Sequence, residues 1–204
     1  TSEAVTIGMN SQLIVDGLLK IKPIDAPNNA AGLTADQGTV EAGSVEVEGG
    51  NFTTAGIGAQ SSLRITSNTS KSIVVHGDGQ TAIPGQMNVG TSTIDGGLAM
   101  TVGQSGTLNL RSSLLFPSTL SIGGNQGTGT VAIANGGSLI LGTGGGAIAV
   151  NNGGLLDLQT GSSFSPGANV TINVNAGGTL KSVPELLITP GATLALNGGA
   201  LQAT

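Results

Sequence analysis

The chain has 204 residues, of which only 8% are charged and 1% are aromatic, while 36 are glycine and none is cysteine. Typical globular proteins carry about 25% charged residues, and disordered chains combine low hydrophobicity with high net charge, whereas this chain is 38% hydrophobic with a formal net charge of -5. The composition therefore excludes a disordered chain, a small disulfide-rich domain and a nucleic-acid-binding protein, which needs clustered lysine and arginine. No apolar run reaches the roughly 18 residues of a membrane-spanning helix, so we expect no membrane insertion.

Short strands separated by glycine turns are predicted from the N-terminus onward. Apolar residues alternate with small or polar ones, which is the period-two pattern of a β-strand. One interruption, residues 23–38, has little apolar pattern and contains Pro27-Asn28-Asn29, so we expect a loop that leaves the repeat there. The predicted strand-and-turn units of the first half are 4–8, 13–17, 18–22, 45–50, 63–65 and 73–75.

The second half repeats the same unit more regularly. Strands are expected to start near residues 131, 139, 148 and 156, roughly eight residues apart, so that three short strands make a coil of about 22–25 residues. Glycine and asparagine at the intervening corners permit a positive φ. The predicted units are 120–124, 131–137, 139–142, 148–154, 156–158, 170–174 and 193–199.

These patterns predict an all-β fold without helix, in a single domain that spans residues 1–204. A single-stranded parallel β-helix, or β-solenoid, with about three short strands per coil fits the spacing best, because a β-sandwich needs longer strands and more aromatic residues. The strict six-residue period of a left-handed solenoid is absent, which favours the right-handed form.

Residues 119–139 contain a Gly-Thr-Gly-Thr step, an apolar strand, Asn-Gly-Gly and a second strand. This pattern resembles the autotransporter-associated strand repeats of autotransporter passenger domains, and the similarity is clear over residues 98–204. The resemblance implies a β-helix from a bacterial, Gram-negative surface or secreted protein, either a processed passenger piece or a free-standing relative. Adhesins, self-associating proteins and some enzymes share that scaffold.

Catalytic chemistry is sparse. His76, the single histidine, is followed by Asp78, and the two could form part of a catalytic dyad, but a histidine in a turn is the preferred interpretation. Asp78 with Arg64 and Lys71 is the only grouping that fits a polysaccharide-active β-helix enzyme. The isolated Gly77-Asp78-Gly79 lacks the tandem repeats of a calcium-binding turn. We therefore expect no enzyme, no cofactor and no metal site.

An acidic group comprises Glu41, Glu46 and Glu48. Because Glu46 and Glu48 alternate with valines, both are predicted to point outward on one strand. Paired carboxylates could hydrolyse glycosides or bind a cation, but a solvated face that discourages edge aggregation is the favoured interpretation.

Both ends of the predicted solenoid lack a capping segment, which natural solenoids normally carry. We therefore predict an end-to-end contact through Val5 and Ile7 at one end and Leu194, Leu196 and Leu201 at the other. Three functions stay open at this point. The first is a non-enzymatic structural or adhesive scaffold at the cell surface or outside the cell, with a host or matrix surface or glycan as partner. The second is a homo-oligomeric filament subunit, and the third is a polysaccharide-active enzyme.

Overall fold

The computed structural model describes most of the chain, and the account that follows is confined to that part. The described residues are 4–21, 32–36, 39–48, 51–55, 62–65, 72–76, 86–89, 93–103, 105–110, 114–124, 127–134, 136–141, 146–182, 186 and 188–203. They form β-strands and turns, and no helix occurs among them.

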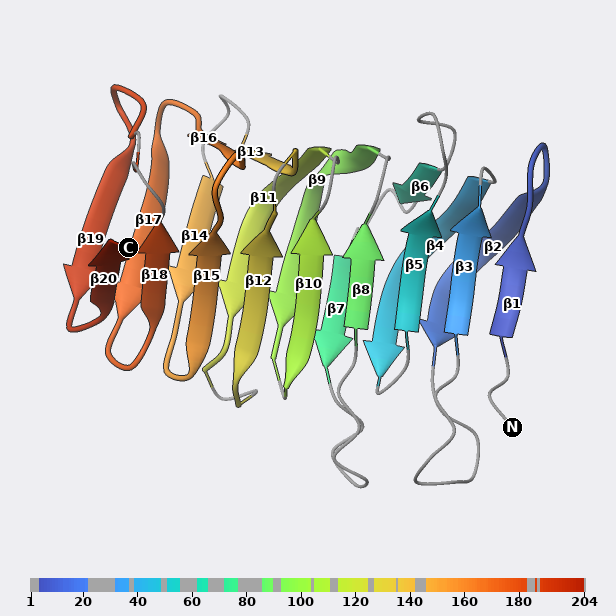
Figure 1. Ribbon diagram of the computed structural model, residues 1–204, viewed down its shortest axis with the longest axis horizontal. Coiled ribbons are helices and arrows are strands. Elements are labelled where there is room, and N and C mark those ends of the chain that lie inside the picture. The colour runs from blue at the N-terminus through green and yellow to red at the C-terminus, as the bar shows by residue number, and fades with distance from the viewer. Residues whose placement is uncertain are drawn as a thin grey trace.

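Two sheets of parallel strands run side by side along the whole molecule, from β1 near the N-terminus to β20 near the C-terminus (Figure 1). The first sheet contains β1 (Ala4–Ile7), β3 (Gly32–Asp36), β5 (Asn51–Ala55), β8 (Gln86–Val89), β10 (Gly106–Leu110), β12 (Gly129–Ile133), β15 (Gly154–Leu158), β18 (Thr179–Ser182) and β20 (Ala200–Ala203). The second sheet contains β2 (Gln12–Ile21), β4 (Thr39–Glu48), β6 (Ser62–Ile65), β7 (Ser72–His76), β9 (Thr93–Val102), β11 (Leu114–Ile122), β13 (Ser138–Leu141), β14 (Gly146–Val150), β16 (Ser163–Pro166), β17 (Val170–Asn175) and β19 (Thr193–Asn197).

The chain alternates between the sheets, so each pass adds one strand to the first sheet and then crosses the second. In some coils the second sheet receives two short strands, as with β13 and β14 or β16 and β17. In others these fuse into one strand of 9 or 10 residues, as in β9 and β11. The fold is therefore the predicted parallel β-solenoid, in which three short segments make a coil. Its right-handed sense stays a prediction.

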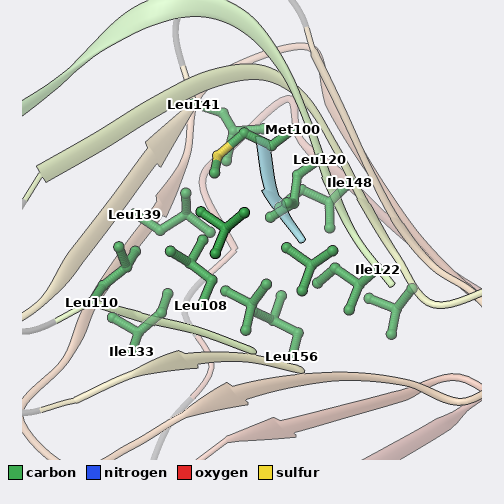
Figure 2. Packing of buried hydrophobic residues seen from close by; sticks show 14 of the residues in the cluster. Met100, Leu108, Leu110, Leu120, Ile122, Ile133, Leu139, Leu141, Ile148 and Leu156 are labelled. Carbon is green, nitrogen blue, oxygen red and sulfur yellow. The ribbon is translucent and has the colours of Figure 1, made fainter. Parts of the chain in front are cut away.

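Inward side chains stack into continuous apolar columns. In the first sheet Leu108, Val131, Leu156 and Leu180 are consecutive register partners, and all are fully buried. Figure 2 shows Leu108 and Leu156 of this column in one apolar cluster with side chains of the second sheet, among them Ile122. Each strand alone covers little apolar surface, so the stability of a coil depends on its neighbours.

Several corners in the described part of the chain share one turn geometry, in which an N–H donates to the carbonyl three residues earlier. The Gly154 N–H donates to the Asn151 carbonyl at 2.8 Å, and the equivalent bond joins Gly178 to Asn175 at the same distance. The third residue of these turns has a positive φ, which is 72° at Gly153. Such a conformation favours glycine because it lacks a Cβ, so the repeated Asn-x-Gly-Gly sequence encodes the corner.

One predicted loop is wrong in part. Gly32–Asp36 lies within residues 23–38, yet it forms β3, which pairs with β1 and β5. Its inward Leu33 is buried in the core. A segment of five residues with one large apolar side chain is too short to show an alternating apolar and polar pattern in the sequence. The rest of the predicted loop that precedes β3 lies outside the described residues.

A second glycine in the corner sequence is required by close packing. A Cβ at Gly154 would collide with the backbone carbonyl oxygen of Ile122 in the preceding coil and lie 2.9 Å from that of Asn151. A Cβ at Gly17 would meet nothing within 4 Å, so this position is a matched control.

We expect Gly154→Ala to lower the free energy of unfolding by about 1–3 kcal/mol, the usual cost of overpacking, while Gly17→Ala changes it by less than about 0.5 kcal/mol. Urea denaturation followed by circular dichroism measures both. Equal effects of the two substitutions would contradict the packing argument.

Candidate functional site at the ends and outer faces of the solenoid

The apolar columns reach both ends of the described chain. Val5 and Leu201 are the outermost members of the column that contains Leu180, and they are 57% and 45% exposed. Leu196 continues the column of Val174 in the second sheet and is 49% exposed. The interior of the solenoid therefore becomes surface at β1 and at the β19–β20 pair.

The five residues predicted for an end contact lie on the first and the last strands of the two sheets. Leu194, Leu196 and Leu201 come together at one end, and Val5 and Ile7 lie at the other. Ile7 and Leu194 are only partly exposed, because both pack against the buried core. That these residues make contact with another coil stays a prediction.

Three further exposed apolar residues were not predicted from the sequence. Met9 lies in the turn after β1, and Ile14 and Leu18 lie on β2. Ile14 lies between Leu13 and Val15, which pack against the core. The sequence contains a signal for this exposure, because Leu13, Ile14 and Val15 are three consecutive apolar residues. Successive side chains of a strand point to opposite faces, so one of the three must point away from the core. All large apolar residues that are exposed in the described part of the chain belong to the first or the last coil.

Charged residues of the first strands lie opposite one another across neighbouring strands. Lys20 and Glu46 form an ion pair at 3.1 Å, and the flanking Val45 and Val47 are fully buried, so the predicted alternation of β4 is confirmed there. The backbone register places Glu48 opposite His76. In the Lys20–Glu46 pair, opposite charges on directly opposed residues stabilise the contact between β2 and β4.

The register also places Glu41 opposite Arg64. The other two residues considered for catalysis, Asp78 and Lys71, lie outside the described residues. Within the described part no three His, Cys, Asp or Glu side chains are grouped so that they could hold a metal ion. In the same part, no helix is long and apolar enough to span a membrane.

A second charged pair lies on the outer face of the first sheet. Lys181 is 3.3 Å from an Asp157 carboxylate oxygen, and the Gln159 amide donates to the other oxygen at 3.2 Å. Asp157 and Lys181 are register partners on β15 and β18. Their attraction therefore acts between two successive coils, and it is of the modest strength typical of ion pairs near the surface.

A row of polar side chains, here called the asparagine ladder, links the corners that end β14, β17 and β19. The Asn175 amide donates to the Asn151 side-chain oxygen at 2.8 Å, and the Asn197 amide donates to that of Asn175 at 3.3 Å. Asn151 in turn donates to the Ser121 hydroxyl at 3.2 Å. Four successive coils are thus joined by side-chain hydrogen bonds parallel to the solenoid axis.

The outer face of the second sheet is built from small side chains between β9 and β19. Outward positions alternate with the buried column residues, and they stack in register from coil to coil. We call this surface the outer small-residue face; its members are Ala99, Thr101, Thr119, Ser121, Ala147, Ala149, Thr171, Asn173, Thr193 and Ala195. It presents uncharged groups at the spacing of parallel strands, about 4.8 Å.

The described chain thus belongs structurally to the parallel β-solenoids. No family model and no curated protein matches its sequence. Among solved structures it is similar to a crystal structure of a TibC-catalyzed hyper-glycosylated TibA fragment, with 14% identity and a TM-score of 0.24 over 99% of this chain and 95% of that one. A match this weak adds no argument about function.

The asparagine ladder predicts a specific loss of stability. Asn175→Ala removes the hydrogen bonds to Asn151 and Asn197, each worth about 0.5–1.5 kcal/mol, so we expect the free energy of unfolding to fall by roughly 1–3 kcal/mol. Asn173→Ala is the control on the same strand, because Asn173 accepts one longer bond, 3.4 Å, from Asn197. Chemical denaturation measures both. A larger effect at Asn173 would contradict the ladder.

Proposed function

We propose that this chain is a non-enzymatic structural and adhesive scaffold of a bacterial surface or secreted protein, and that it acts outside the cell. The observation that carries the proposal is the outer small-residue face, which five neighbouring strands of the second sheet hold over columns that are buried from β9 to β17. Such a face has low relief, repeated hydroxyl groups and one amide, that of Asn173. It fits an extended, flat partner such as a glycan or a matrix surface.

The charge arrangement supports a scaffold over an enzyme. Glu46 is ion-paired with Lys20 across two strands, and Asp157 is ion-paired with Lys181. Hydrolysis of a glycoside needs two carboxyl groups flanking one bond, whereas these two carboxylates belong to different sheets. The repeated Gly-Thr and Asn-Gly-Gly sequences, similar to autotransporter passenger repeats, support an extracellular location.

The adhesive role is tested by placing a charge on the outer small-residue face. Ala149 lies between Ser121 and Asn173 in the register of that face, so Ala149→Arg disrupts it without touching the core. Thr130→Arg makes the same change on the outer face of the first sheet. Binding of the labelled chain to a glycan array and to immobilised matrix proteins is the measurement.

We expect Ala149→Arg to lose most of the bound signal and Thr130→Arg to retain it. Equal binding by both variants would contradict the assignment to this face. Absence of binding by the unaltered chain to every glycan and matrix protein would overturn the adhesive role. Release of new reducing ends from a polysaccharide would overturn the non-enzymatic one.

A second candidate, a subunit that polymerises end to end, is favoured by the exposed column residues. A second copy can dock its β1 on β20 of the first copy in parallel register. Val5 then extends the column of Leu201, and Ile7 extends the column of Ala203. In the second of these contacts the large side chain of Ile7 meets the small side chain of Ala203. The second sheets then join through β2 and β19. Addition of a strand to an open sheet edge is a known recognition mode.

Leu196→Asp should abolish filament formation and leave the fold intact, because an unpaired carboxylate buried at the junction costs at least roughly 2 kcal/mol. Gln202→Asp is the control, since it adds the same charge to an outward, exposed position on β20. Negative-stain electron microscopy over a range of concentrations measures assembly. Filaments of Leu196→Asp equal to those of the unaltered chain would rule out this junction.

A further inference from the structure

We draw no further inference here: the strongest candidate, the group of exposed apolar side chains formed by Ile14 and Leu18 on β2 and Met9 in the turn before it, carries no proposal because nothing in the structure shows what covers it.

Discussion

In-register stacking of short parallel strands is the constraint on which the rest of this structure depends. A strand of four or five residues has two or three inward side chains, which cannot form a core alone. Leu156 is fully buried because Val131 precedes it and Leu180 follows it in the column. The same requirement explains the scarcity of aromatic residues, since branched aliphatic side chains fill successive layers about 4.8 Å apart. Phe52 is buried where its register partners are Leu33 and Met87.

Stacking also restricts which residues the corners between strands can contain. Because one corner lies directly above another, the position after the turn has no room for a Cβ, and Gly154 and Gly178 satisfy this. The asparagine ladder also depends on corners that lie above one another, because each asparagine side chain then finds its hydrogen-bond partner in the neighbouring coil. Substitution of these corner glycines is therefore expected to destabilise the stack of coils. The outward positions, by contrast, are released from packing and are available for recognition.

The candidate functional site could be predicted from the sequence only in outline. The sequence placed Leu196 and Leu201 at one end and Val5 at the other, because each belongs to the first or last apolar unit of a repeat. It could not find the outer small-residue face, since alanine, serine and threonine carry no distinctive pattern until their strands are aligned. Nor could it pair His76 with Glu48, because neighbours across strands depend on the length of the intervening coil.

The sequence by itself determined the period of the fold. Alternation within strands and glycine turns between them are local properties, so the strands of residues 129–133, 138–141, 146–150 and 154–158 were anticipated closely. Only the tertiary structure decided which strands pair, that Gly32–Asp36 joins the first sheet, and that two short segments fuse into β9 or β11. Those outcomes depend on how coils of unequal length are brought into register, and that requires contacts between residues about 20 or more positions apart, which no local pattern records.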